Sequence, residues 1–242
     1  MIIPTLQQIK DAFQKKGYNY FTGSNPYNLN IWGIRKQYGQ IDLFDDFLGI
    51  SYVDEGGIEQ MICHKATVDP GKYYLKDKTI NPNGTFILVP GQYLGCWQSG
   101  LHNVNKPSKY SALIQKNGYK GFNGWRDNNK NGKIDRNLNS NGKYFNDVTG
   151  LNMHRSSSSF ATIVGPYSAA CQVRQHNKSH LSVMDIIQKS LHYFSDSFSY
   201  TLFDEEDVYG VPNLVNTKSA TRGGNSETAL KKWPEDYVNV ER

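Results

Sequence analysis

The chain contains 242 residues, enough for one large domain with a sizeable core, and its 38% hydrophobic and 13% aromatic residues exclude a disordered chain. The net charge of +5 comes from scattered Lys and Arg residues rather than a basic block, so we expect no nucleic-acid partner. No apolar run reaches the ~18 residues that a membrane span requires, so we expect no stable membrane insertion.

The first predicted element is an amphipathic helix over residues 5–16. Leu6, Ile9 and Phe13 recur at helical spacing, and Thr5 is suited to cap the amino end. An aromatic and polar loop follows Gly17. We therefore expect residues 1–27 to form a small N-terminal helix and loop.

Most of the remaining chain is typical of short strands separated by turns. Runs of β-branched and aromatic residues bounded by Gly, Pro and Asn predict strands within residues 29–36, 45–57, 59–68, 85–93, 110–119 and 198–203. A second helix is predicted over residues 182–194, with Ser182 as its cap. The expected fold is α+β with mostly antiparallel strands, a core domain over residues 28–204 and a polar C-terminal tail over residues 205–242.

One segment carries a pattern suited to cysteine chemistry. His154 lies in a Ser-rich stretch, and Cys171 follows after a run that allows a turn and a return strand. A thiol needs a neighbouring base to become an effective nucleophile, and the small residues Ser168, Ala169 and Ala170 allow backbone N–H groups to approach a carbonyl. Free cysteine is also among the most buried residue types, so a structural thiol is the alternative interpretation.

The same segment resembles the catalytic motif of the L,D-transpeptidase family (the YkuD-like domain), in which a histidine precedes a Ser/Thr-His-Gly-Cys sequence. Here thirteen residues separate His154 from Ser168-Ala169-Ala170-Cys171, slightly fewer than in the family. Upstream, residues 67–73 (TVDPGKY) are similar to the family's Thr-Pro-x-Gly-x-Phe/Tyr element with one residue inserted. The resemblance covers residues 31–203 with a poorly matched middle, and it implies an L,D-transpeptidase-like β-sandwich for residues 28–204.

The resemblance also implies roles for residues. Cys171 would attack a carbonyl of a peptidoglycan stem peptide to form a thioester, and His154 would carry the proton. Ser168 would orient the imidazole, and the N–H groups of Ala170 and Cys171 would hold the oxyanion. Apart from the resemblance, His102 is expected in a loop between strands, where it is a candidate for contact with substrate, and an ordinary exposed loop histidine is the alternative. No cofactor is required by this chemistry.

The sequence departs from the family motif at several positions. Ala169 and Ala170 replace the motif His and Gly, and the usual Arg two residues after the cysteine is Val173, with Arg174 one residue further on. The segment over residues 90–115 is more similar to divergent phage-encoded members. We therefore expect a phage endolysin or virion-associated lysin that cleaves peptidoglycan, with virion or lysis components as further partners.

Three other functions remain open. A crosslinking L,D-transpeptidase would use the same residues with an amine as acceptor. A non-catalytic phage structural or wall-binding protein would explain the two alanines, and a nucleic-acid-associated protein would be favoured only by charge. The N-terminus lacks the basic and apolar regions of a signal peptide, and the odd number of cysteines suits a reducing compartment. We expect synthesis in the host cytoplasm and action at the cell wall.

A second motif imitates a calcium loop. Asp127, Asn129, Asn131 and Asp135 place oxygen side chains at positions 1, 3, 5 and 9, with glycine at position 6. Position 12 is Leu138 instead of the usual bidentate Glu, so any structural calcium would bind weakly. His176 and His180 have metal-ligand spacing, but "HNKSH" is predicted to be a turn rather than a helix.

Overall fold

The computed structural model describes residues 1–77, 80–135 and 143–210. The helices are α1 (Leu6–Lys16), α2 (Asn177–Ser190) and α3 (Glu205–Tyr209), with short helical turns at Tyr73–Asp77 and Gly165–Tyr167. The strands are β1 (Asn30–Arg35), β2 (Asp46–Val53), β3 (Glu59–Thr67), β4 (Thr85–Leu88), β5 (Gly91–His102), β6 (Tyr110–Gln115), β7 (Phe122–Asp127), β8 (Lys143–Val148), β9 (Met153–Arg155), β10 (Gln172–Arg174) and β11 (Phe198–Asp204).

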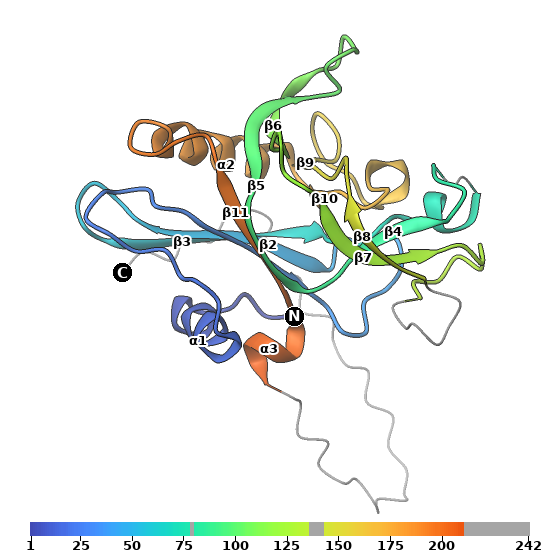
Figure 1. Cartoon of the computed structure of the whole chain (residues 1–242), viewed down its shortest axis with the longest axis horizontal. Helices are drawn as coiled ribbons and strands as arrows, with labels where there is room; N and C mark the ends of the chain where they lie inside the picture. Colours follow the sequence, from blue (N-terminus) through green and yellow to red (C-terminus); the bar gives the residue numbers. More distant parts are fainter. Residues whose placement is uncertain (78–79, 136–142, 211–242) are drawn as a thin grey trace, which may run out of the picture.

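The main sheet closes on itself in the order β1-β11-β5-β6-β9-β10-β3-β2, as a closed barrel (Figure 1). The pairs β1–β11 and β9–β10 are parallel, whereas the other pairings are antiparallel. The predicted α+β class with mostly antiparallel strands is confirmed, and the arrangement is compatible with a β-sandwich-like fold. The parallel β9–β10 pair is the part of the sheet that carries the cysteine motif.

A second sheet, in the order β4-β7-β8, lies beside the barrel (Figure 1). Phe86 of β4 and Phe122 of β7 are buried in the same apolar cluster as Trp97 and Tyr200 of the barrel. Burial of such large aromatic side chains favours association of the two sheets, because each removes a large apolar area from water. The small sheet is thus part of the same core.

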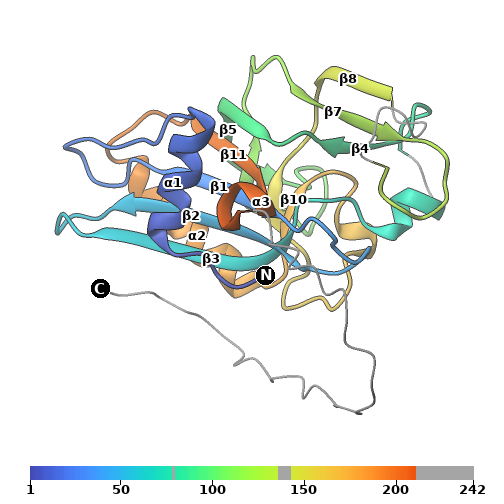
Figure 2. The same cartoon turned by 90° about the horizontal axis from the view of Figure 1, so that it is seen from below.

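Helices α1 and α3 cover one side of the barrel, and α2 covers the opposite side (Figures 1 and 2). The prediction for α1 is confirmed: Thr5 caps the helix, with Gln8 completing a capping box. Ile9 and Phe13 pack against Trp32 and Phe203 of the barrel. Residues 1–27 are therefore attached to the sheet through an apolar face, and residues 205–209 of the expected tail form α3. The rest of that tail lies outside the described residues.

The second helix is present, but its predicted bounds were wrong at both ends, because α2 ends at Ser190 rather than at residue 194. Helix α2 begins at Asn177, after the N-cap His176, so Ser182 is not the cap and instead donates a hydrogen bond to Ser179 O. The sequence "HNKSH" is the start of this helix rather than a turn. Its polar first turn hides the periodicity that becomes clear only from Val183 onward.

The predicted strand over residues 85–93 is also wrong, because it is divided between the two sheets. Strand β4 ends at Leu88 and β5 begins at Gly91, with Pro90 between them. Proline lacks the N–H that a continuous ladder requires, which explains the break. Strand β5 then runs to His102, so this residue ends a strand instead of lying in a loop. Among the described residues, no helix has the length and apolar character needed to cross a membrane.

Candidate functional site

The histidine and the cysteine of the motif come from two adjacent parallel strands. His154 of β9 lies opposite Val173 of β10, and the Gln172 N–H donates to Asn152 O over 2.9 Å. Side chains alternate along a strand, so Cys171, Val173 and His154 belong to the same face of this pair. Gln172 lies on the other face, where it accepts a hydrogen bond from the buried Tyr200 hydroxyl over 2.7 Å.

Hydrogen bonds define the tautomer of His154. Its Nδ1 lies 2.7 Å from Arg155 O, and a carbonyl oxygen can only accept. Nδ1 therefore carries the proton, and Nε2 keeps its lone pair. Burial of the ring, followed by the neighbouring His102, lowers the pKa of His154 to about 3. The imidazole is neutral at physiological pH, which is the form that a general base requires, but a pKa this far below 7 makes it a weak proton acceptor.

Tyr110 is a contact of this histidine that sequence reasoning missed. Its hydroxyl lies 3.2 Å from His154 Nδ1 and donates to Arg155 O over 3.2 Å. The Arg155 guanidinium lies over the Tyr110 ring at 4.0 Å from its centroid. Tyr110 begins β6, and nothing in its local sequence distinguishes it from an ordinary strand residue, since these contacts depend on the pairing of β6 with β9.

His102 covers one face of the same imidazole. The two rings are stacked with centroids 4.0 Å apart and planes inclined by 18°. The Asn152 side-chain amide donates to His102 Nδ1 over 3.3 Å. His102 keeps partial solvent exposure, and burial lowers its pKa. The structure thus places the predicted substrate-binding histidine against the predicted base.

Cys171 immediately precedes β10 and retains partial exposure to solvent. It packs at the margin of a small apolar cluster formed by Phe44, Val164 and Val173. Burial of the sulfur raises the pKa of Cys171 to about 11, and the backbone of Asn152 opposes this shift by hydrogen bonding. At neutral pH the sulfur is therefore a thiol, and its proton must be removed during any nucleophilic attack.

The prediction that Ser168 orients the imidazole needs correction. The Ser168 hydroxyl is fully buried and donates to Cys171 O over 2.8 Å, so it holds the backbone of the cysteine. Arg155 O and Tyr110 hold the imidazole instead. Ala170 is buried, and its carbonyl accepts from the Gln172 side chain over 3.2 Å. The role predicted for the Ala170 N–H, to hold the oxyanion, stays a prediction.

The two sequence motifs meet in space. The Gly71 N–H donates to Ser168 O over 2.9 Å, and the Tyr74 hydroxyl donates to Pro166 O over 3.2 Å. A Cβ atom at Gly71 would lie 2.1 Å from Gly165 O, so only glycine allows this approach. The upstream motif therefore supports the backbone that leads into Cys171.

Arg174 does not replace the arginine that the family motif has two residues after the cysteine. Strand alternation places Val173 on the face of Cys171 and Arg174 on the opposite face. The Arg174 side chain is fully buried, and desolvation lowers its pKa to about 10. A shift of one residue therefore places this arginine on the face opposite Cys171.

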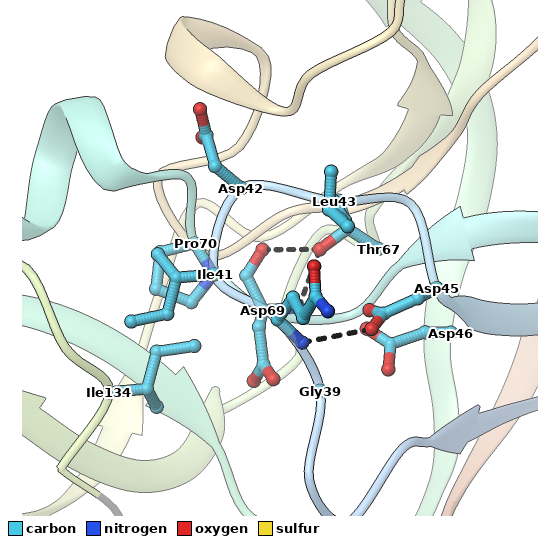
Figure 3. Close-up of a pocket in the computed structure, with 11 residues that line it drawn as sticks. Gly39, Ile41, Asp42, Leu43, Asp45, Asp46, Thr67, Asp69, Pro70 and Ile134 are labelled. Atoms are coloured by element: carbon cyan, nitrogen blue, oxygen red, sulfur yellow. Dashed lines mark hydrogen bonds between the residues drawn. The ribbon is translucent and has the colours of Figure 1, made fainter. Parts of the chain in front are cut away.

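A small acidic pocket lies beside the upstream motif (Figure 3). Asp42 is one of the residues that line it, and its carboxylate accepts from the Lys72 N–H over 2.9 Å and the Gly165 N–H over 2.7 Å. The hydroxyl of Thr67, another lining residue, donates to Asp69 O over 2.8 Å. The cavity volume of about 10 Å³ has room for roughly one water molecule. These carboxylates therefore fix loops rather than receive a substrate.

The calcium-like loop is internally hydrogen bonded. The side chains of Asp127, Asn129 and Asn131 each accept from the N–H two residues later, and Asp127 also accepts from the Asp135 N–H over 3.1 Å. Leu138, at position 12, lies outside the described residues. Within the described part of the chain, no group of three or more His, Cys, Asp or Glu side chains is arranged to hold a metal ion. Calcium binding stays a prediction.

His176 and His180 have separate environments. His176 packs against the Phe160 ring with centroids 4.4 Å apart, while the buried His180 Nε2 lies 2.7 Å from Ser111 O, to which it donates. These contacts favour structural roles for both residues. Comparisons of the whole chain with protein-family models, with curated proteins and with solved structures found no match.

Proposed function

We propose that the protein is a cysteine enzyme that cleaves peptidoglycan stem peptides through a thioester. The observation that carries the proposal is the state of His154: its Nδ1–H is bound to Arg155 O, which leaves Nε2 as an acceptor on the strand parallel to the one that Cys171 precedes. A nucleophilic cysteine requires a neutral base within hydrogen-bond reach. His154 is the neutral histidine on the adjacent strand, although among the described residues no hydrogen bond joins it to Cys171.

In the proposed reaction, the Cys171 sulfur attacks the carbonyl carbon of a stem-peptide bond. The thiol proton passes to His154 Nε2, a C–S bond forms, and the C–N bond breaks as the imidazolium returns the proton to the departing amine. Backbone N–H groups of Ala170 and Cys171 stabilise the negative charge on the carbonyl oxygen. Water then hydrolyses the thioester and regenerates the thiol.

We propose hydrolysis rather than crosslinking by analogy with the phage-encoded family members that the segment over residues 90–115 resembles. A phage benefits from an enzyme that cuts the bacterial wall. An amine acceptor in place of water would make the same thioester a crosslinking intermediate. The bacterial wall is the proposed site of action, and virion or lysis components are the proposed further partners.

Digestion of purified peptidoglycan, with mass spectrometry of the released muropeptides, tests the proposal. We expect fragments from the native protein, none from Cys171→Ser, and a strong loss with His154→Gln. Cys63→Ser and His192→Gln are matched controls, because Cys63 lies in the cluster under α1 and His192 is exposed. A thioester adduct on the Cys171 peptide would support the mechanism, and undiminished turnover in Cys171→Ser would refute it.

A non-catalytic wall-binding role is the second candidate. The raised pKa of Cys171 favours it, because the sulfur is a thiol rather than a reactive thiolate at neutral pH. The alanines at positions 169 and 170 favour it too, because they depart from the catalytic motif that the segment resembles. Sedimentation with intact peptidoglycan, unaffected by Cys171→Ser and without released fragments, would support this candidate over the first.

A further inference from the structure

The side chain of Arg155 is a cation without a counter-ion at the edge of the candidate site. Arg155 is partly exposed, and its nitrogens form no hydrogen bond or ion pair with the rest of the described chain. They are open to solvent, in contrast to the unpartnered nitrogens of the fully buried Arg35 and Arg174. We propose that Arg155 binds the terminal carboxylate of the amino acid that leaves in the reaction. This inference rests on the proposed function, because it names the group that the same site recognises.

Tyr110 holds the guanidinium of Arg155 in place. The guanidinium lies 4.0 Å from the centroid of the tyrosine ring, and the Tyr110 hydroxyl donates to Arg155 O over 3.2 Å. The ring also packs edge-to-face against His180, with centroids 5.7 Å apart. Contact with an aromatic ring leaves the N–H groups of a guanidinium available, and these form a planar fork that matches the two oxygens of a carboxylate. The arrangement is therefore prepared for a planar anion.

The surroundings of Arg155 are electropositive. Residues 78–126 and 148–184, which contain β5, β6, β9 and β10, include no Asp or Glu. Lys106 and Arg155 both lower the pKa of His102, and no carboxylate opposes them. A charged region of one sign attracts ligands of the opposite sign, so this side of the site favours an anionic group.

His102 supplies a further donor beside Tyr110. The Asn152 amide donates to His102 Nδ1, so the proton of the neutral ring is on Nε2. The His102 ring is partly exposed and lies 5.4 Å from the Tyr110 ring, centroid to centroid. A guanidinium and a neutral N–H next to the same tyrosine favour an acceptor with two oxygens. Peptides carry carboxylates but no phosphate, so a carboxylate is the anion that the proposed substrate offers.

The proposed reaction selects one carboxylate of the peptide. His154 returns the proton to the departing amine, so the leaving group lies on the histidine side of the site, and Arg155 is the next residue of β9. A C-terminal amino acid carries its carboxylate on the same α-carbon as this amine. The leaving group of an internal bond has a neutral amide there instead. Arg155 therefore favours cleavage of the last bond of a peptide.

An NMR titration of the full-length Cys171→Ser protein tests the inference, because this variant does not turn over the ligand. The probes are N-acetyl-L-lysyl-D-alanine, its C-terminal amide and inorganic phosphate. We expect the acid to bind with a Kd of about 1 mM and the amide to bind about tenfold more weakly, which corresponds to ~1.4 kcal/mol. Salt at 1 M should reduce this difference, since exposed charges are screened.

Matched arginine variants test whether Arg155 causes the difference. Arg155→Gln should make the acid and the amide bind equally, and it keeps the carbonyl that holds the His154 ring. Arg155→Lys keeps the charge without the planar fork, so it should retain part of the preference. Arg126→Gln is the control, because Arg126 also lies over aromatic rings, those of Phe86 and Phe145, but belongs to β7 of the small sheet. Circular dichroism checks that each variant is folded.

Turnover by the native protein separates this inference from the proposed function. Equal cleavage of the acid and the amide would overturn the role of Arg155 and leave the cysteine mechanism standing. Selective binding of the acid that depends on Arg155, without cleavage of either peptide, would support the inference and refute the enzyme. Absence of peptide binding, equal binding of both peptides, tighter binding of phosphate than of the acid, or an equal effect of Arg155→Gln and Arg126→Gln would each overturn the inference.

Discussion

The imidazole rings of His102 and His154 lie face to face, with centroids 4.0 Å apart, although their strands β5 and β9 are separated in the barrel by β6. His102 ends β5 opposite Tyr110, and Tyr110 in turn contacts the Nδ1 side of His154. The neutral base is therefore enclosed by two aromatic residues from the same β5–β6 hairpin. The environment of the proposed base is built by a segment some fifty residues upstream of it in the sequence.

Removal of the covering ring should raise the pKa of His154. In His102→Ala, water reaches the imidazole and the neighbouring charge is lost, and these are the two largest causes of the depressed pKa. We expect the pKa to move from about 3 towards the ordinary 6.5, measured by NMR titration of the ring C–H signals. His102→Phe keeps the cover and should retain most of the depression. An unchanged pKa in His102→Ala would contradict the assigned cause.

Tyr110→Phe should test the orientation of the base. The substitution removes the hydroxyl that contacts His154 Nδ1 and Arg155 O, but it keeps the ring beneath the Arg155 guanidinium. We expect a loss of about 1 kcal/mol in the free energy of unfolding and a decrease in kcat with little change in KM. Tyr119→Phe is the control, because Tyr119 is also partly buried but lies away from His154. Equal effects of the two substitutions would show that the Tyr110 hydroxyl does not orient His154.

The pKa of the Cys171 thiol predicts its reactivity. Because this pKa is about 11, the thiolate fraction and the rate of alkylation by iodoacetamide should rise about tenfold per pH unit between pH 7 and 10. Cys63 and Cys96 are more deeply buried, and burial raises the pKa of each further, so peptide mapping should find Cys171 modified first. A rate that levels off near pH 8 would show an ordinary or activated thiol instead.

The elements that were predicted correctly are those whose formation depends on residues close together in the sequence. The cap at Thr5 and the strands β2 and β3 depend on neighbouring residues, so they were predicted from the sequence. Pro90 marks the break within residues 85–93, but tertiary packing decides that the two halves join different sheets. The polar first turn of α2 gives no local signal of a helix. The same is true of the candidate site: the sequence predicted His154 and Cys171, but Tyr110 contacts His154 only because β6 pairs with β9.

Gly71→Ala should disturb the cysteine segment from a distance in sequence. The added Cβ would lie 2.1 Å from Gly165 O. Because the atoms in contact with it belong to the backbone of Gly165, no flexible side chain can move to relieve the clash. We expect a loss of about 1–3 kcal/mol in the free energy of unfolding, together with changed alkylation kinetics at Cys171. Gly91→Ala is the control, since its nearest atoms lie 4.0 Å away. Native-like stability and kinetics in Gly71→Ala would show that the two motifs are not coupled.

Buried histidines should make the fold sensitive to acid. Burial lowers the pKa of His64 and of His154 to about 3 and that of His180 to about 4, against 6.5 for an exposed histidine. Between these values and 6.5 the unfolded chain binds more protons than the folded chain, so stability falls as pH decreases. Each histidine contributes about 1.4 kcal/mol per pH unit in this range.

One buried carboxyl opposes this trend. Burial and the neighbouring Asp69 raise the pKa of Asp46, so its folded form takes up a proton before the unfolded form does and gains stability as pH decreases. With the three histidines His64, His154 and His180 against one carboxyl, we expect a net loss of about 3 kcal/mol per pH unit between pH 6 and 5, measured by urea unfolding. His180→Gln should flatten this slope, because glutamine can still donate to Ser111 O but does not titrate. A slope that stays the same in His180→Gln would show that other groups govern the acid response, since the loss of one titrating histidine must remove its share of the proton uptake on unfolding.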